Sequence, residues 1–295
     1  MTTLNKNICL GFVGLGSIGL PIAINLRKAG FSLQAHTRSR KAESDKDLQG
    51  AKACPSPKEA AEVCNVFLIC VSDGDAVEEV LFGNEGAISS LKKGAIIIDL
   101  STIDPQKARF FASKLKKRNI EYIDAPVTGG TEGAKKGELT IFLGANNNSL
   151  KRIESILKAI GSSIYTFEHV GKGQEVKAIN QILVAGSYMA VAEAIALGQS
   201  LDLPMSKVIT ALQKGAASSW ALTNRSTAML KDKYPLGFKL YLHHKDLSIA
   251  LKAAEECSIK LPVTSKVKEL EEILIKEGYK DNDVSVLRKA IKKKS

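Results

Sequence analysis

The segment from Ile182 to Leu197 limits how this chain can fold more than any other segment, because Glu193 is its only charged residue. A helix that is apolar on all sides is either buried on nearly every face or crosses a membrane. A membrane span needs about 20 mostly apolar residues. A segment of that length would have to include Glu193 and the polar residues just before this run, namely Lys177, Asn180 and Gln181. We therefore expect no membrane span, but a buried helix from about Gly171 to Gln199 that lies between two domains.

Length and charge set the next limits. With 295 residues the chain is longer than a single core usually allows, so two domains are expected. Its net charge is +11, from 42 Lys and Arg against 31 Asp and Glu, which favours anionic ligands without selecting one of them. The basic segment 288–294 has no aromatic residues between its charges. We expect it to be a solvated helix end and expect no binding of nucleic acid.

The cysteines indicate the compartment. There are five of them, an odd number, without the Cys-x-x-Cys or Cys/His spacing that binds metal. Several lie in apolar runs, so we expect reduced thiols in a cytoplasmic protein and no metal site. Residues 1–7 lack the charged and apolar regions of a signal peptide, which agrees with a cytoplasmic location.

A strand, a glycine-rich turn and a helix follow one another at the start of the chain. The apolar run 8–13 is typical of a buried parallel strand, and residues 20–29 have a helical pattern. Between them, Gly14 permits a tight turn, Gly16 lets a pyrophosphate approach the backbone, and Gly19 lets the helix pack against the strand. A turn without a ligand is the weaker alternative, because the flanking pattern matches a dinucleotide site. The predicted cofactor-binding residues of this turn are Gly14, Leu15, Gly16, Ser17, Ile18 and Gly19.

The end of the second predicted strand, 31–36, indicates which dinucleotide binds. An NAD site usually offers an acid to the ribose hydroxyls there, and no acid occurs before Glu43. Arg38, with Arg40 in reserve, can bind a 2′-phosphate instead. We therefore expect NADP, with NAD as the second candidate, and a solvated basic turn is the alternative. The predicted cofactor-binding residues of this turn are Thr37, Arg38 and Ser39.

Strands and helices continue to alternate, which predicts an α/β fold with a doubly wound parallel sheet of the Rossmann type. Apolar strands at 66–71 and 95–100 are each followed by a helical segment. Ligands of such sheets bind beyond the carboxyl ends of the strands. These ends carry Val71, Ser72 and Thr102, which we expect to line the nicotinamide end of the cofactor.

A second loop rich in glycine and hydroxyl groups follows the predicted strand 121–124. It contains Thr128, Gly129 and Gly130, and its backbone N–H groups could hold a carboxylate. Composition alone leaves a tight turn before the strand 139–143 equally open.

The remainder of the chain has only helical patterns. They lie at 205–215, 224–231, 244–257, 262–277 and 285–293. We expect a dinucleotide-binding domain over residues 1–168 and an all-α domain, for substrate binding and oligomerisation, over residues 169–295.

Five segments occur in an order that belongs to a known family. They are Gly14–Pro21, Asp99–Ile103, Asp124–Gly130, Gly171–Lys177 and Phe238 with Lys245–Leu247. With them, essentially the whole chain resembles the β-hydroxyacid dehydrogenases, the family of 3-hydroxyisobutyrate dehydrogenase and tartronate semialdehyde reductase. The resemblance implies that Lys177 is the catalytic general acid/base, that Asn180 orients the substrate and that Thr102 lies between substrate and cofactor.

The resemblance also implies roles for two further groups of residues. One group would hold the carboxylate of the substrate and consists of Thr128, Gly129 and Gly130. The other would lie over the active site near the cofactor and consists of Phe238 and Lys245, with Asp246 nearby. This chain departs from the family at Thr128, where serine is commoner, and at Gln181, where the family typically has asparagine four residues after the lysine. Gln181 keeps an amide in the substrate site but has a longer reach, so the substrate geometry is expected to differ.

The resemblance implies an NADP(H)-dependent oxidoreductase that interconverts a small 3-hydroxy acid, or a 2-hydroxy acid, and its semialdehyde or oxo acid. A sugar phosphate is not expected, because 6-phosphogluconate dehydrogenases have a much longer helical domain. Imine reductases share the fold but usually lack a lysine at the position of Lys177. A catalytically idle dinucleotide-binding or scaffold protein is the alternative. We expect a homodimer or homotetramer, because the apolar helix exceeds what one chain can cover.

Overall fold

The computed structural model describes residues 8–291. The chain divides into two compact units, residues 1–177 and 178–295, which we call unit 1 and unit 2. The division falls within helix α7 (Lys172–Ser200), whereas the sequence predicts a boundary at 168/169, before that helix. The expectation for residues 1–7, and the end of the basic segment at 292–294, lie outside the described residues.

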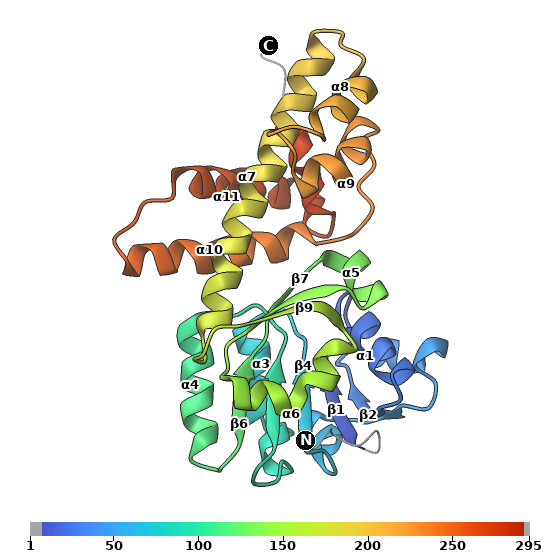
Figure 1. The fold of residues 1–295 in the computed structure, drawn as a ribbon, viewed down its shortest axis with the longest axis vertical. Coiled ribbons are helices and arrows are strands. Elements are labelled where there is room, and N and C mark those ends of the chain that lie inside the picture. Colours follow the sequence, from blue (N-terminus) through green and yellow to red (C-terminus); the bar gives the residue numbers. More distant parts are fainter. Residues whose placement is uncertain (1–7, 292–295) are drawn as a thin grey trace. The chain divides into compact units, whose positions relative to one another are not determined.

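Unit 1 contains a six-stranded sheet in which every pair of neighbouring strands is parallel. Its strand order is β3-β2-β1-β4-β5-β6. The strands are β1 (Cys9–Val13), β2 (Ser32–His36), β3 (Lys52–Ala53), β4 (Val66–Ile69), β5 (Ile96–Asp99) and β6 (Glu121–Asp124). The order reverses between β1 and β4, which is the arrangement of a doubly wound dinucleotide-binding sheet. The predicted fold of this region is confirmed (Figure 1).

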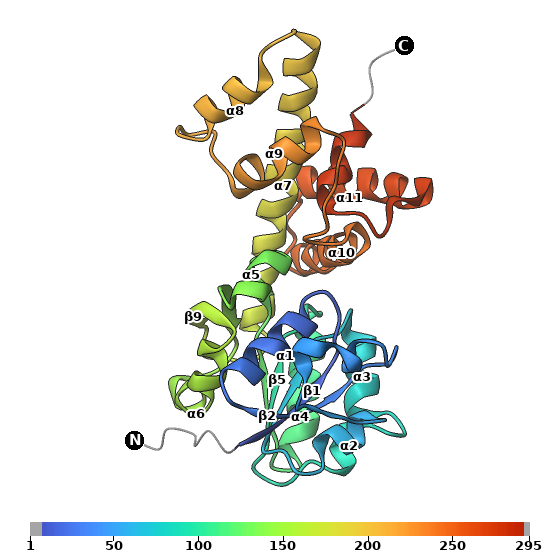
Figure 2. The ribbon, with the colours of Figure 1, turned by 90° about the vertical axis from the view of Figure 1, so that its right-hand side faces the viewer.

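Helices cover both faces of this sheet (Figure 2). They are α1 (Gly19–Lys28), α2 (Pro57–Ala61), α3 (Gly74–Phe82), α4 (Pro105–Lys116) and α6 (Asn147–Lys158). One apolar core joins Leu10 and Phe12 of β1 to α1 and α6. A second core joins Val13 and Phe67 to α2, α3 and α4. Residues of the central strands are buried on both faces, which explains why their sequences are continuous apolar runs.

A second, three-stranded sheet lies in unit 1, and the sequence does not predict it. It consists of β7 (Val127–Thr128), β8 (Leu139–Leu143) and β9 (Gly161–Thr166), with helix α5 (Gly130–Lys136) between β7 and β8. β7 is antiparallel to β8, and β8 is parallel to β9. Only Gly161 of β9 is fully buried, so β9 lacks the apolar signal by which a strand is recognised.

Unit 2 is all-helical in its described residues apart from an isolated bridge between Lys239 and Asp283. After α7 come α8 (Met205–Leu212), α9 (Trp220–Leu230), α10 (Leu240–Glu256) and α11 (Pro262–Leu274), a π-helical turn (Ile275–Tyr279) and a 3₁₀ helix (Val284–Ala290). The all-α prediction is confirmed. α9 and α10 each begin four residues before the predicted start. For α9 a signal was present in the sequence, because the hydroxyl of Ser219 caps the helix by accepting from the N–H of Leu222 at 3.1 Å.

The prediction that α7 is buried on nearly every face is wrong for the single chain. Ala185 and Ala192 are buried in the core of unit 2, but Leu183 is 69% exposed and Leu197 is 62% exposed. The helices of unit 2 cover one side of α7, and a helix that is apolar all round then leaves its other side in solvent. By length and composition alone, α7 could also cross a membrane, and it is the one such helix among residues 8–291.

Candidate active site

Three glycines shape the turn between β1 and α1. Gly14 has a φ of +102°, and a Cβ there would lie 2.2 Å from the carbonyl oxygen of Cys70. A Cβ at Gly19 would lie 1.8 Å from the carbonyl oxygen of Gly14. A Cβ at Gly16, in contrast, meets no atom within 4 Å. Gly14 and Gly19 are therefore required by contacts within the protein, whereas Gly16 leaves open space beside the backbone that a bound phosphate could occupy.

The other residues of this turn differ in exposure. Leu15 is buried in the core of unit 1, so only its backbone faces the turn. Ser17 is exposed, and Ile18 stands at the N-cap of α1, where it makes no side-chain hydrogen bond. The first N–H groups of α1 are therefore not capped by Ile18, and helix N-termini of this kind attract phosphate. The residues present fit the pyrophosphate of a dinucleotide.

At the end of β2, Glu43 folds back onto the turn. Its carboxylate accepts from the backbone N–H of Thr37 at 2.8 Å and pairs with the guanidinium of Arg40 at 2.8 Å. Arg40 also donates to the carbonyl of Cys54, so it is bound within the protein and is not in reserve for a cofactor. Arg38 and its neighbour Ser39 are exposed, and Arg38 makes no hydrogen bond or ion pair with residues 8–291.

The loops after β4 and β5 lie at the same edge of the sheet, because the two strands are parallel neighbours. The backbone N–H of Val71 donates to the hydroxyl of Ser101 at 3.0 Å, which joins the two loops. Ser72 is exposed and donates to the carboxylate of Asp73 at 2.7 Å. Thr102, next to Ser101, is half-buried. The structure thus brings Val71, Ser72 and Thr102 to one edge, where the sequence predicts the nicotinamide end of the cofactor.

A buried carboxylate holds the loop after β5. Asp99, the last residue of β5, accepts from the hydroxyl of Tyr122 at 2.6 Å and from the backbone N–H of Ser101 at 2.9 Å. Burial raises the pKa of Asp99 to about 6, although both hydrogen bonds act to lower it. Asp99 therefore fixes the position of the loop and does not face a ligand.

A second buried carboxylate fastens the start of α7. Asp124 accepts from the backbone N–H groups of Gly171 at 2.7 Å and Gln174 at 2.9 Å. Burial raises the pKa of Asp124 to about 6. The side chain of Gln174 accepts from the N–H of Ile103 at 3.0 Å and donates to the carbonyl of Ser101 at 2.8 Å. The first turn of α7 is thereby fixed to the loop after β5.

Lys177 follows this fixed turn and is only 6% exposed. Asn180 comes three residues later on the same continuous helix and is half-buried. Residues three apart are neighbours on a helix surface, so the amine and the amide share one face of α7. Gln181 is 1% exposed, and its amide lies between the side chains of Asn180 and Asp246, at 2.6 and 2.7 Å.

The predicted loop of Thr128, Gly129 and Gly130 is the connection from β7 to α5: Thr128 ends the strand, Gly129 is the N-cap of the helix and Gly130 is its first residue. Gly129 has a φ of +130° and Gly130 a φ of +64°, which side chains other than glycine rarely adopt. All three residues are half-buried. The loop therefore requires its glycines for its conformation, and its role in binding a carboxylate stays a prediction.

In unit 2, α10 carries the other residues that the family resemblance selects. Lys245 pairs with the carboxylate of its neighbour Asp246, with the ammonium 3.0 Å from Oδ1, and Asp246 is 3% exposed. Phe238, just before the helix, packs edge-on against the imidazole of His243, with ring centroids 5.6 Å apart. His243 is fully buried and lies 2.5 Å from the carboxylate of Glu271.

The predicted catalytic and substrate-binding residues offer hydroxyl, amide, amine and backbone groups. Residues 8–291 contain no group of three His, Cys, Asp or Glu side chains that could hold a metal ion. All five cysteines are free thiols, as the sequence predicts.

Sequence comparisons identify both parts of the chain. Residues 9–171 match the family described as the NAD binding domain of 6-phosphogluconate dehydrogenase. Residues 171–291 match the family described as NAD-binding of NADP-dependent 3-hydroxyisobutyrate dehydrogenase. The chain belongs to the β-hydroxyacid dehydrogenase family. The predicted family is confirmed, and the chain is an NAD(P)-dependent hydroxyacid dehydrogenase.

Individual β-hydroxyacid dehydrogenases match over almost the whole chain. The 2-hydroxy-3-oxopropionate reductase of Escherichia coli is 36% identical over 282 residues, which are 96% of each protein. The 2-(hydroxymethyl)glutarate dehydrogenase of Eubacterium barkeri is 33% identical over 263 residues, 89% of this chain and 87% of its own length. The crystal structure of a 3-hydroxyisobutyrate dehydrogenase from Salmonella typhimurium is 29% identical, with a TM-score of 0.86, and the match covers 97% of this chain and all of that one.

Several residues of this β-hydroxyacid dehydrogenase that hold the site together are not assigned a role from the sequence. Asp99 and Asp124 each end an otherwise apolar strand, and an acid in that position is a visible sign of a capped loop. The sequence does not predict the roles of Gln174 and Glu43. Their partners, after the end of β5 and in the turn after β2, are known only from the structure.

Proposed function

We propose that the chain uses NADP(H) to interconvert a small 3-hydroxy acid, or a 2-hydroxy acid, and its semialdehyde or oxo acid, with Lys177 as the general acid/base. One observation carries the proposal. Lys177 is a buried amine that follows a helix turn fixed by Asp124 and Gln174, and Asn180 shares its helix face. A proton must leave the substrate oxygen when a hydroxy acid is oxidised and return when the oxo acid is reduced, and one positioned amine can serve both directions.

The cofactor supplies or accepts the hydride when it is bound. The turn at Gly14–Gly19 would hold its pyrophosphate, where Gly16 leaves the backbone open. Val71, Ser72 and Thr102 would line the nicotinamide end at the edge formed by β4 and β5. Phe238 and Lys245 are proposed to lie near the cofactor by family resemblance alone.

The proposal of NADP over NAD rests on the turn after β2. Glu43 is the acid nearest to that turn, and both of its carboxylate oxygens are occupied, by Thr37 and by Arg40. Arg38 is exposed without a protein partner among residues 8–291. A guanidinium in that state is suited to a 2′-phosphate, with which it forms charge-assisted hydrogen bonds.

We also propose that the chain is a homodimer or homotetramer in the cytoplasm. The exposed face of α7 is close to a palindrome about Ala190. Leu183 and Leu197 lie seven residues to either side, and Ile179 and Leu201, the residue just after the helix, lie eleven residues to either side. A two-fold axis at Ala190 would place Leu183 against the partner's Leu197, so the face complements itself. The side chains nearest the crossing are small, since Gly186 and Ala194 lie four residues from Ala190, and a Cβ at Gly186 meets no atom within 4 Å.

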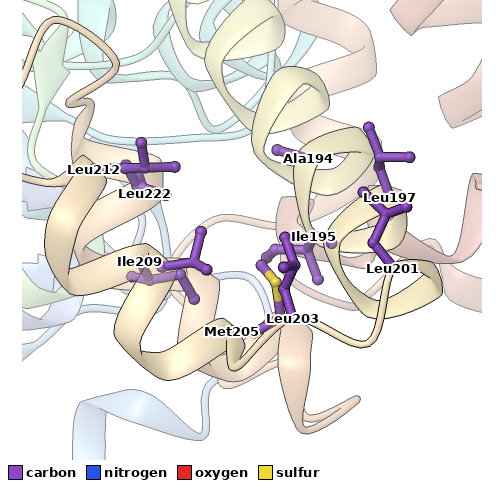
Figure 3. Close-up of a pocket in the computed structure, with 11 residues that line it drawn as sticks. Ala194, Ile195, Leu197, Leu201, Leu203, Met205, Ile209, Leu212 and Leu222 are labelled. Atoms are coloured by element: carbon purple, nitrogen blue, oxygen red, sulfur yellow. The ribbon is translucent and has the colours of Figure 1, made fainter.

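An apolar hollow continues this face at the end of α7 (Figure 3). Its lining comes from α7, α8 and the loop between them, with Leu222 of α9, and Leu197 and Leu201 belong both to the hollow and to the exposed face. Glu193 is also exposed on α7, which favours a protein surface as the partner over lipid, because a charge in the bilayer core is costly.

The activity is tested by incubating the purified protein with NADPH and a panel of semialdehydes and oxo acids, and with NADP and the matching hydroxy acids. The panel includes 2-hydroxy-3-oxopropionate and 3-hydroxyisobutyrate. Each acid is compared with an analogue in which the carboxylate is replaced by a neutral amide. We expect turnover of at least one acid and loss of turnover with its amide. A protein that binds NADPH but turns over no member of the panel would instead be a catalytically idle dinucleotide-binding protein.

A further inference from the structure

A chain of two hydrogen bonds leads from α10 to Asn180. Asn180 Nδ2 donates to Gln181 Oε1 at 2.6 Å, and Gln181 Nε2 donates to Asp246 Oδ2 at 2.7 Å. Gln181 and Asp246 are 1% and 3% exposed. All three residues lie in unit 2. The two ends of the Gln181 amide are therefore both engaged by side chains of the protein.

The order of donors and acceptors in this chain has a cause. An ionised carboxylate can only accept hydrogen bonds, so Asp246 requires the NH₂ end of Gln181. The carbonyl end of Gln181 then faces Asn180, which must present its own NH₂ group. This leaves the carbonyl oxygen Oδ1 of Asn180, which no hydrogen bond among residues 8–291 uses. One buried carboxylate thus sets the orientation of two successive amides.

The carboxylate itself is held in place from several directions. The ammonium of Lys245 lies 3.0 Å from Asp246 Oδ1. His243 lies one turn earlier on α10 and is paired with Glu271 of α11. Burial acts to lower the pKa of His243, but the carboxylates of Glu271 and Asp246 raise it above its usual value. Asp246 is therefore held next to the ammonium of Lys245, one helical turn from the His243–Glu271 pair.

We propose that Gln181 and Asp246 are positioning residues, which turn the amide of Asn180 so that it offers its carbonyl oxygen to a hydrogen-bond donor on the face of α7 that carries Lys177. The donor is the hydroxyl group of a hydroxy acid. This inference rests on the proposed function. It gives Gln181 a role different from direct substrate binding, and it accounts for the longer amide, whose two ends reach Asn180 and Asp246 at hydrogen-bonding distance.

The test replaces the hydrogen-bond donor of Gln181 by an acceptor while keeping the shape of the side chain. In Gln181→Glu, two carboxylates face each other in a buried site, and they repel or trap a proton between them. We expect kcat/KM for the best acid of the panel to fall about ten- to a hundredfold, the range for a disrupted buried hydrogen bond. The KM for NADPH should change less than kcat/KM for the acid, because Gln181 lies outside the turns that are proposed to bind the phosphates of the cofactor.

The double variant Gln181→Glu/Asp246→Asn restores the pairing. The carboxylate introduced at position 181 would accept from Asn180 and from the amide introduced at position 246. The amide of Asn180 then keeps its orientation, and we expect most of the lost kcat/KM to return. A role in packing alone predicts no such recovery, and thermal unfolding of each variant shows whether it is folded. The matched control is Gln199→Glu, the same substitution at an exposed position near the end of the same helix, with activity unchanged.

Two results would overturn the proposal. Gln181→Glu could keep wild-type kcat/KM, or the folded double variant could remain as impaired as the single variant. Failure of the proposed function is a different result, namely a wild-type protein that turns over no acid of the panel, and it would remove this inference as well.

Discussion

At the scale of single residues, Arg38 carries the proposed choice of cofactor. It is the exposed guanidinium in the turn after β2, whereas Arg40 is neutralised by Glu43. Arg38→Ala should therefore lower kcat/KM with NADPH about ten- to a hundredfold, the worth of one charge-assisted hydrogen bond or two, and leave kcat/KM with NADH unchanged. Lys41→Ala removes a neighbouring exposed charge and should alter neither value. An unchanged ratio of NADPH to NADH efficiency in Arg38→Ala would rule out this role.

At the scale of elements, two buried carboxylates at strand ends connect the sheet to α7 and to the loop after β5, and they predict a dependence of stability on pH. The pKa of Asp99 is raised by burial from 3.8 to about 6 in the folded protein. The folded state therefore binds more protons than the unfolded state between about pH 4 and 6. The contribution of protonated Asp99 to the free energy of unfolding is fully present below about pH 4 and is lost as the pH rises through about 6.

Asp99→Asn removes this titration and keeps the shape of the side chain. Relative to wild type, its free energy of unfolding should rise by at most about 3 kcal/mol between pH 4 and pH 7.5, since about two pKa units are involved. Denaturant unfolding at the two pH values measures the difference. The exposed Glu85→Gln serves as the control and should show no such change. A difference between wild type and Asp99→Asn that is the same at both pH values would contradict the account.

At the scale of the whole molecule, the exposed face of α7 predicts self-association. We expect sedimentation velocity at micromolar concentration to show a dimer or tetramer, and Leu183→Glu/Leu197→Glu to show a monomer, because each palindromic contact would then bury a charge. Ile273→Glu, at a half-exposed position on α11, is the control and should leave the mass unchanged. A monomeric wild-type protein, or an unchanged mass in the double variant, would refute this interface.

The parts of the fold that the sequence predicts are those whose signals are local. Continuous apolar strands and the glycine turn at Gly14–Gly19 predict the doubly wound sheet, and the absence of further strand patterns predicts the all-α unit. The second sheet could not be predicted, because β9 is mostly half-exposed and has no apolar alternation. The exposure of α7 could not be predicted either, since an all-round apolar helix does not reveal which side is covered by its own chain and which is left for another.

In the candidate site, too, the sequence predicts what local motifs carry and misses contacts between residues far apart in the chain. The sequence predicts the glycine turn from its spacing and flanking pattern, and the family resemblance selects Lys177 and Asn180, whose roles stay predictions. The supports of the site are contacts between residues far apart in the chain, such as Gln174 with the loop after β5 and Gln181 with Asp246. Sequence alone identifies Gln181 as an unusual amide but does not show that both of its ends are engaged.

The central claim is that Lys177 exchanges the proton of the substrate. We expect Lys177→Ala to bind NADPH as wild type does in a fluorescence titration, because the turns proposed to bind the phosphates lie elsewhere in unit 1. Turnover should fall by roughly two to four orders of magnitude, the usual contribution of a general acid/base. Lys177→Arg should fail almost as badly, since a guanidinium stays charged at any working pH and cannot exchange the proton.

The deciding measurement is therefore single-turnover reduction of the best acid by folded, NADPH-loaded Lys177→Ala. The account predicts a rate at least about a hundredfold below that of wild type. A rate close to that of wild type would contradict it, since Lys177 would then be structural and the proton would have to come from Lys245 or from water.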